Sequence, residues 1–336
     1  MTEFQIPYES LTALKDKVIL ITGSTSGIGL ATARLALSLG AKVIAGDINT
    51  FPDAGLNEGD KETKLPNKGN LLFIQTDVSS WPSIRNLFVR GIQHFGRIDH
   101  VFANAGIGPR INFLEETFET GPDAESGTGA VTEGEEDESE LHQASRLSPP
   151  DLRVLDVNLL GVIYTVRLGV YFLRRFTSKP AGDTENEGEG SSPSIVTTAS
   201  ASSFQDFSAG DYTVAKHGVL GLLRGLYTDL LQVQEPPSPT YPRIRLNGIA
   251  PSWTATGIVA ADILRRFGAE VQEPEDVAKS VLCLFNDKEK HGMLVYSWGG
   301  RYAEVNRCEG GLLEGIARLV PNVAMEGAVL ERLKGR

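Results

Sequence analysis

A glycine-rich turn between an apolar strand and a helix constrains this chain more than any other feature. Residues 18–22 (VILIT) are mostly β-branched, and Gly23, Gly27 and Gly29 follow them in the run GSTSGIGLATA. Glycines at these positions allow a tight turn and a close approach of the backbone to a pyrophosphate over the next helix N-terminus. The pattern predicts the first strand–turn–helix unit of a doubly wound sheet, with a dinucleotide site at the turn.

Strand and helix patterns alternate from about residue 17 to about residue 295. Buried-strand patterns cover residues 16–23, 41–47, 71–78, 100–106, 193–200 and 244–251, and helical patterns cover 27–40, 83–96 and 151–176. The alternation predicts a single α/β domain over residues 1–336, with one doubly wound parallel sheet (a Rossmann fold) and helices on both faces. We expect its core over residues 14–305 and a C-terminal extension with helical spacing over 306–336.

The acidity of the chain belongs to one segment. The net charge is −11, but residues 111–145 hold eleven of the 43 acidic residues and no lysine or arginine, which leaves 32 acids against 32 basic residues. The segment has little to bury, so we expect a mobile acidic surface insertion over about 115–145. Two more polar or proline-rich stretches, 178–194 and 234–242, are predicted to be surface loops. Without a basic surface, nucleic-acid binding is not expected.

Features that the sequence lacks predict the cellular compartment of the protein and the absence of a metal site. The first twenty residues do not resemble a signal peptide, and no apolar run approaches the roughly 18 residues of a membrane span. Cys283 and Cys308 are too few for a disulfide framework and lack metal-ligand spacing. We therefore expect a cytoplasmic protein with no membrane association and no metal.

An acidic residue at the end of the second strand bears on the choice of cofactor. Asp47 lies 18 residues beyond Gly29. A carboxylate there can accept hydrogen bonds from the adenosine ribose hydroxyls and would repel a 2′-phosphate. The turn residues Ser24, Thr25 and Ser26 offer no positive charge to such a phosphate. The sequence favours NAD over NADP.

Tyr212 and Lys216 lie four residues apart in the apolar helical run DYTVAKHGVLGLL. Residues at this spacing are neighbours on a helix, and an ammonium group beside a phenol favours its ionised form. The pair is therefore a candidate for proton transfer. The alternative is a core tyrosine beside a lysine that extends to water.

Several motifs in order along the chain resemble those of the short-chain dehydrogenase/reductase (SDR) family, from about residue 14 to 305. They are TGSTSGIG, the pair Asp77–Val78, ANAG at 103–106, Asn158 in DVNLLGV, SIVTTASAS before Tyr212, and IAPSWTAT at 249–256. Ala103 replaces the first asparagine of the family's NNAG motif, and Ser252 replaces a common glycine. The cofactor contacts that the resemblance implies are Gly23, Ser26, Gly27, Ile28, Gly29, Asp47, Asp77, Val78, Asn104, Ala105, Gly106, Tyr212, Lys216, Pro251, Thr254 and Thr256.

The same resemblance implies a catalytic set of Asn158, Ser200, Tyr212 and Lys216. Tyr212 would be the general acid/base, and Lys216 would hydrogen-bond the nicotinamide ribose and lower the tyrosine pKa. Ser200 would hydrogen-bond the substrate oxygen, while Asn158 would hold a water near the lysine. Ser200 precedes Tyr212 by one residue fewer than is usual in the family, so Ser202 is an alternative catalytic serine.

Apolar and aromatic side chains are expected around the substrate. The candidate pocket walls are Ile107, Arg110, Phe204, Gln205 and Trp253, and Ser202 is included as a substrate-binding residue. They favour a medium-sized, largely apolar alcohol or ketone, with aromatic and polycyclic skeletons included. The surface insertions and GGRYAEV (299–305) resemble fungal members of the family, some of which act in secondary metabolism.

The leading hypothesis is an NAD-dependent oxidoreductase that interconverts a secondary alcohol and a ketone. Alternatives are an NADPH-dependent ketoreductase, a non-redox family member that binds a ligand or assists an isomerisation or cyclisation, and a scaffold that uses the acidic insertion. The long apolar helices near residues 151 and 212 favour a homodimer or homotetramer, as in the family.

Overall fold

The computed structural model describes residues 3–52, 69–110, 115–118, 141, 143–177, 192–232, 242–258, 260–320 and 329. Most of the predicted acidic insertion and the end of the C-terminal extension lie outside these residues. The strands are β1 (Glu3–Phe4), β2 (Val18–Thr22), β3 (Lys42–Asp47), β4 (Leu71–Gln75), β5 (His100–Ala103), β6 (Ser194–Thr198), β7 (Arg245–Pro251), β8 (Leu294–Trp298) and β9 (Arg301–Glu304).

All nine strands form one sheet in the order β1-β9-β8-β7-β6-β5-β2-β3-β4. The seven strands from β4 to β8 are parallel, as predicted, and the order reverses between β2 and β5. The predicted doubly wound parallel sheet is thus confirmed, and at one edge β9 and β1 extend it by antiparallel pairing. The cause is a two-residue turn of Gly299 and Gly300, both with positive φ, that folds β9 back onto β8 as a hairpin.

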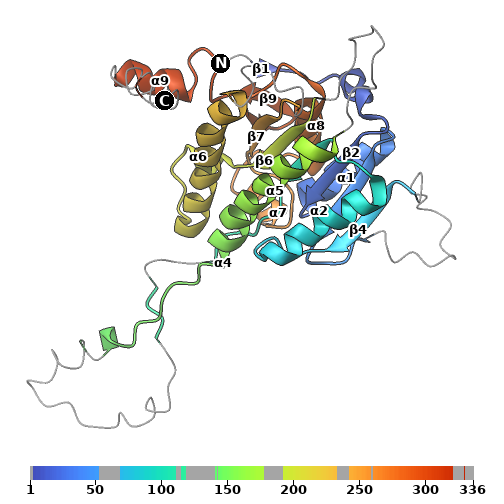
Figure 1. Cartoon of the computed structure of the whole chain (residues 1–336). Coiled ribbons are helices and arrows are strands. Elements are labelled where there is room, and N and C mark those ends of the chain that lie inside the picture. The colour runs from blue at the N-terminus through green and yellow to red at the C-terminus, as the bar shows by residue number, and fades with distance from the viewer. Residues whose placement is uncertain are drawn as a thin grey trace, which may run out of the picture.

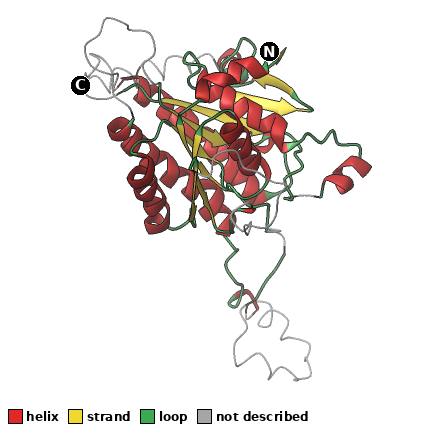
Figure 2. Cartoon of the chain, turned by 90° about the vertical axis from the view of Figure 1, so that its right-hand side faces the viewer, coloured by secondary structure: helices red, strands yellow, loops and turns green. Residues whose placement is uncertain are grey.

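Helices cover both faces of this sheet (Figures 1 and 2). One face carries α2, α5 and α6, which lie in a row in Figure 1, and the other carries η1, α1 and α8. Successive β2 residues point to opposite faces, so Leu20 joins one hydrophobic core and Ile19 and Ile21 the other. The helices are η1 (Tyr8–Leu14), α1 (Gly27–Ser38), α2 (Trp81–Phe95), α4 (Arg153–Leu155), η4 (Asp156–Leu160), α5 (Gly161–Phe176), η5 (Ala201–Ser203), α6 (Gly210–Gln232), α7 (Ala261–Arg266), α8 (Pro274–Asn286) and α9 (Leu312–Leu319).

The helix predicted over 151–176 begins at Arg153 and is not regular. A π-helical turn, η4, separates α4 from α5 and contains the buried Asn158. Such turns insert one residue into a helix and often occur at functional sites. By length and composition, Arg153–Phe176 could cross a membrane, but α5 buries one face on β5 and β6 and has the role of a core helix.

The two arms of the acidic insertion meet where the structure describes them. Phe118 and Leu147 form an antiparallel bridge, and the Ser148 N–H donates to the Thr117 carbonyl oxygen (2.7 Å). Within the insertion predicted to be mobile (about 115–145), residues 119–140 lie outside the described part of the chain. In the C-terminal extension, the predicted helical spacing is realised as α9.

Candidate active site

The glycine-rich turn leaves β2 and enters α1 with no room for larger side chains. Gly23 and Gly27 have φ angles of +66° and +49°, which favour glycine. A Cβ on Gly29 would lie 1.9 Å from the Gly23 carbonyl oxygen, so only glycine lets α1 begin this close to the turn. The N-terminus of α1 therefore faces the crevice with unpaired backbone N–H groups, which suits a pyrophosphate.

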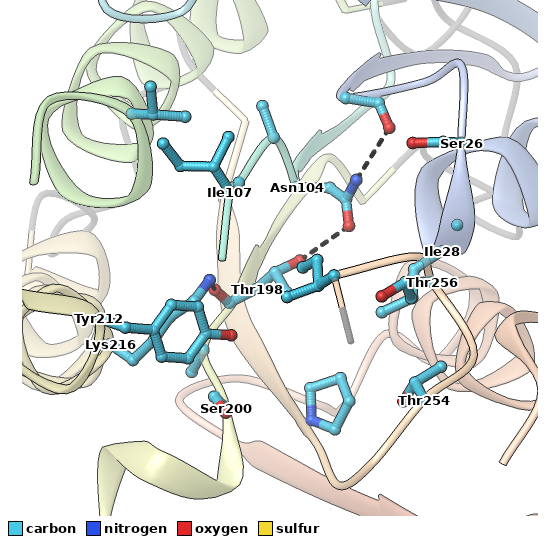
Figure 3. Close-up of a pocket in the computed structure, with 18 of the residues that line it drawn as sticks. Ser26, Ile28, Asn104, Ile107, Thr198, Ser200, Tyr212, Lys216, Thr254 and Thr256 are labelled. Carbon is cyan, nitrogen blue, oxygen red and sulfur yellow. Dashed lines mark hydrogen bonds between the residues drawn. The ribbon is translucent and has the colours of Figure 1, made fainter. Parts of the chain in front are cut away.

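Asn104 connects this turn to the end of β6. Its Nδ2 donates to the carbonyl oxygens of Thr22 and Gly23 (both 3.1 Å), and its Oδ1 accepts from the Thr198 hydroxyl (3.2 Å). The bond to Thr198 is drawn in Figure 3. The side chain thus fixes the carboxyl ends of β2, β5 and β6 at the point where the strand order reverses, where ligands bind in doubly wound sheets.

Asp47 ends β3 with its carboxylate almost fully buried. One oxygen accepts from the Thr25 N–H (3.0 Å) and the other from the Asn49 N–H (2.9 Å). These two bonds hold the carboxylate at the rim of the pocket, beside the exposed Ile48. A negative charge fixed at this place can accept from ribose hydroxyls and would repel a phosphate.

Tyr212, Lys216 and Ser200 meet at the end of β6 (Figure 3). Lys216 is buried and donates from Nζ to the Thr198 carbonyl oxygen (2.8 Å), with Nζ 5.5 Å from the Tyr212 ring centroid. Burial lowers the pKa of Lys216 to about 8. Since Lys216 has three donor hydrogens and only one is used here, two stay free for a ligand.

The pKa of Tyr212 departs from the direction that the sequence predicts. Burial raises this pKa, and a hydrogen bond with the Ser200 hydroxyl acts against the rise. The net direction is therefore opposite to the one expected from the neighbouring Lys216, because removing the phenolate from water has the larger effect here. That Lys216 itself stabilises the phenolate stays a prediction. The tyrosine is a neutral phenol near pH 7, able to donate its proton.

The serines around Ser200 differ in their contacts. The Ser200 Oγ accepts from the Ser202 N–H (3.2 Å) and contacts the Tyr212 phenol. Ser202 lines the same pocket, and its buried hydroxyl has no hydrogen-bond partner. Ser203, which the sequence did not single out, accepts from the Ser200 N–H (3.2 Å) and donates to the Lys216 carbonyl oxygen (2.8 Å). It holds the serine turn against α6.

Asn158 lies behind the pocket wall and not in it. Its Oδ1 accepts from the Ile107 N–H (2.8 Å), and its Nδ2 donates to the Ile107 carbonyl oxygen (2.9 Å). The side chain is fully buried. It therefore fixes the loop after β5, while the role of holding a water near Lys216 stays a prediction.

One cavity of about 450 Å³ brings most of the predicted residues together. Of the predicted catalytic, cofactor and substrate residues, only Gly29 and Asn158 do not line it, and both act from behind its wall. Of the other candidate walls, Ile107 lines the cavity. Two are wrong: Arg110 is exposed, and Phe204 packs on Tyr296 and the core. Lining residues that the sequence analysis missed are Ile48, Asn49, Thr76, Pro109, Val157, Thr198, Ala199, Ala201, Phe207, Ser252, Ile258 and Leu264.

The cavity has both charged and apolar lining residues. Its charged groups are Asp47, Asp77 and Lys216, while Pro109, Ile258 and Leu264 are among its apolar lining residues. The Phe207 ring lies 5.7 Å from Trp253 and 6.3 Å from Tyr212. No group of three or more metal-ligating side chains occurs among the residues that the structure describes.

Comparison with known proteins identifies the family. Residues 17–123 match the family model for short chain dehydrogenases. The short-chain dehydrogenase/reductase ascJ of Acremonium egyptiacum is 37% identical over 305 residues, which cover 91% of this chain and 86% of that protein. The chain belongs to the short-chain dehydrogenase/reductase family. It is thus an SDR oxidoreductase, and SDRs use NAD or NADP.

Two further similarities to this SDR are informative. Human 15-hydroxyprostaglandin dehydrogenase (NAD+) is 25% identical over 300 residues, 83% of this chain and 90% of that protein. A crystal structure of an SDR, a glucose/ribitol dehydrogenase from Brucella melitensis, superposes with a TM-score of 0.56 at 19% identity, covering 85% of this chain and 97% of that chain. The second match supports the Rossmann fold.

The residues of the crevice fit a dinucleotide. The glycine turn leaves space and free N–H groups for a pyrophosphate, Asp47 is placed for a ribose, and the free donors of Lys216 lie at the other end beside Tyr212. When bound there, the nicotinamide would give or accept the hydride.

Proposed function

We propose that this SDR interconverts a secondary alcohol and a ketone, with NAD as cofactor and Tyr212 as general acid/base. The observation that carries the proposal is the meeting of Tyr212, Ser200 and Lys216 at one end of a cavity whose other end fits a dinucleotide. A binding protein without redox chemistry would have no need of a buried lysine there.

The proton chemistry follows from these three side chains. In ketone reduction, the Tyr212 phenol donates its proton to the substrate oxygen, and the Ser200 hydroxyl donates a hydrogen bond to the same oxygen. The Ser200 Oγ accepts from the Ser202 N–H, so its own hydrogen is available to donate to the phenol oxygen of Tyr212 or to the substrate oxygen. The Lys216 ammonium stabilises the phenolate that remains. We propose Ser200 and not Ser202 as the catalytic serine, because the Ser200 hydroxyl acts on the pKa of the Tyr212 phenol.

Replacement of the phenol tests the assignment. Tyr212→Phe keeps the ring and removes the proton donor, so we expect turnover of secondary alcohols to fall by about 10²-fold or more with NADH binding nearly unchanged. Tyr8→Phe is a matched control on an exposed tyrosine of η1. Turnover of Tyr212→Phe at the rate of this control would refute the role.

The preference for NAD is supported by the fixed carboxylate of Asp47 and by the absence of a basic side chain among the described lining residues near it. Asp47→Asn removes the charge and keeps one oxygen for a backbone N–H. We expect the ratio of kcat/KM with NAD to that with NADP to fall about tenfold, which corresponds to about 1.4 kcal/mol. Asp77→Asn, which removes a carboxylate elsewhere in the pocket, should leave this ratio unchanged. An unchanged ratio in Asp47→Asn would argue against the assignment.

We infer a neutral, largely apolar substrate, including aromatic and polycyclic skeletons of the kind made in secondary metabolism. The apolar side chains that line the cavity support this, because a charged substrate would lose its hydration against them without a partner. A panel of secondary alcohols matched in size, with and without a carboxylate, tests it. A preference for the anionic compounds would refute the inference.

We also propose that the protein forms a homodimer or homotetramer through α5 and α6. Exposed apolar side chains on these helices support a subunit contact, among them Tyr171 and Val214. Light scattering after size-exclusion chromatography should give two or four times 36.3 kDa. A monomer would overturn this proposal.

A further inference from the structure

A buried carboxylate beside the catalytic tyrosine has no part in the chemistry described so far. Asp211 is 1% exposed and lies in the first turn of α6, immediately before Tyr212. A carboxylate is favoured at a helix N-terminus, but a charge buried this deeply is stable only when its oxygens are hydrogen-bonded. Its partners therefore indicate what the side chain does.

The two oxygens of Asp211 bind two different elements. Oδ1 accepts from the Tyr212 N–H (2.7 Å), and Oδ2 accepts from the Arg110 N–H (3.0 Å). The carboxylate is thus a bridge from the catalytic helix to the loop that follows β5. The bond uses the backbone of Arg110, whose side chain is exposed.

The bridged loop, residues 107–110, forms part of the pocket wall. Ile107 and Pro109 line the cavity, and Figure 3 shows Ile107 on the same side of the pocket as Tyr212. Asn158 holds one end of the loop through Ile107, and Asp211 holds the other end through Arg110. The wall is therefore fastened to both helices that carry the predicted catalytic side chains.

We propose that Asp211 is a positioning residue that fixes the 107–110 loop against Tyr212 and so sets the substrate's place relative to the proton donor. It touches neither the reacting oxygen nor the dinucleotide site. The expected effect on the substrate KM rests on the proposed function, whereas the expected effect on the 107–110 loop rests on the hydrogen bonds alone. Loss of the bridge should loosen the substrate wall and leave the dinucleotide half of the crevice in place.

Two readouts test the proposal in the full-length protein. Asp211→Ala removes both bonds. The loss of one hydrogen bond to a charged acceptor changes an equilibrium constant, here that of loop opening, by about tenfold or more. We expect amide hydrogen exchange in residues 107–110 to quicken about tenfold or more. The KM for a secondary alcohol should rise by a similar factor, while the Kd for NADH changes less than twofold. Asp211→Asn can accept only one of the two N–H groups, so its effects should be intermediate.

The control is Asp206→Asn, which removes an exposed carboxylate five residues earlier and should leave all three quantities unchanged. Unchanged exchange in both Asp211 variants would overturn the proposal. Equal losses in substrate KM and NADH Kd would also overturn it, because they indicate general destabilisation. If the wild-type protein oxidises no alcohol, the proposed function fails, and the exchange rates still decide whether Asp211 fixes the loop.

Discussion

The pair formed by Asn158 and Ile107 gives the sharpest test of how the pocket wall is built. Asn158→Ala removes one accepted and one donated hydrogen bond, at 2.8 and 2.9 Å, from a fully buried site. The Ile107 N–H and carbonyl would be left without these partners. Each unsatisfied group costs about 1–3 kcal/mol, so with two such groups we expect the free energy of unfolding to fall by about 2–6 kcal/mol.

A second variant separates the hydrogen bonds from the loss of volume. Asn158→Asp keeps an acceptor for the Ile107 N–H but, when ionised, faces the Ile107 carbonyl oxygen with a negative charge. Protonation restores a donor, so the folded protein favours the protonated carboxyl and raises its pKa above the unfolded value of about 3.9. The deficit of this variant relative to wild type is therefore largest above the raised pKa and shrinks as the pH falls toward about 4.

Unfolding in urea, followed by far-UV circular dichroism at several pH values, measures both effects. The wild type and each variant are compared at the same pH, so that other titrating groups cancel. A loss below about 0.5 kcal/mol in Asn158→Ala, the usual range for surface substitutions, would refute the reasoning. A deficit in Asn158→Asp that grows as the pH falls would refute it as well.

Three other predictions concern the turn and the buried charges. Gly29→Ala would place a Cβ 1.9 Å from the Gly23 carbonyl oxygen, so calorimetric titration should show NADH binding at least tenfold weaker, whereas wild-type affinity would contradict the cofactor site. Burial lowers the pKa of His100 from 6.5 to about 3. As the pH falls below about 6.5, the unfolded chain binds a proton at this histidine and the folded protein does not, so stability is lost. Between pH 8 and pH 5 the wild type should lose about 2 kcal/mol more than His100→Phe in urea unfolding, and equal losses would contradict this. Arg245 donates to the carbonyl oxygens of Leu284 and Phe285 at the end of α8. Arg245→Leu removes these two bonds from a charged donor and should lower the unfolding free energy by about 3–5 kcal/mol, and a change below about 1 kcal/mol would contradict this.

The parts of the site that depend on local sequence could be predicted. The run of Gly23, Gly27 and Gly29 between a strand and a helix predicts the turn, because no other residue type fits the backbone there. The spacing of Tyr212 and Lys216 predicts neighbours on a helix. The hairpin of β8 and β9 also had a local signal in Gly299 and Gly300, a pair typical of two-residue hairpin turns.

The parts of the site that depend on three-dimensional contacts could not be predicted from the sequence. Burial of Tyr212 is a property of the assembled crevice, so the sequence gives no direction for its pKa beyond that of its neighbour Lys216. The position of Arg110 after a strand predicts a residue of the pocket wall. The sequence does not indicate that its backbone N–H bonds to Asp211 or that its guanidinium is exposed, because both depend on the tertiary structure. The π-helical turn at Asn158 likewise has no signal in the apolar spacing of its helix.

Equilibrium titration of the purified protein with NADH and NADPH, followed by quenching of tryptophan fluorescence, tests the central claim most directly. Trp253 lines the pocket and can report binding. We predict tighter binding of NADH by about tenfold or more, a difference of about 1.4 kcal/mol, because Asp47 would face the 2′-phosphate of NADPH. Equal or tighter binding of NADPH would contradict the cofactor assignment, and binding of neither would contradict the proposed function.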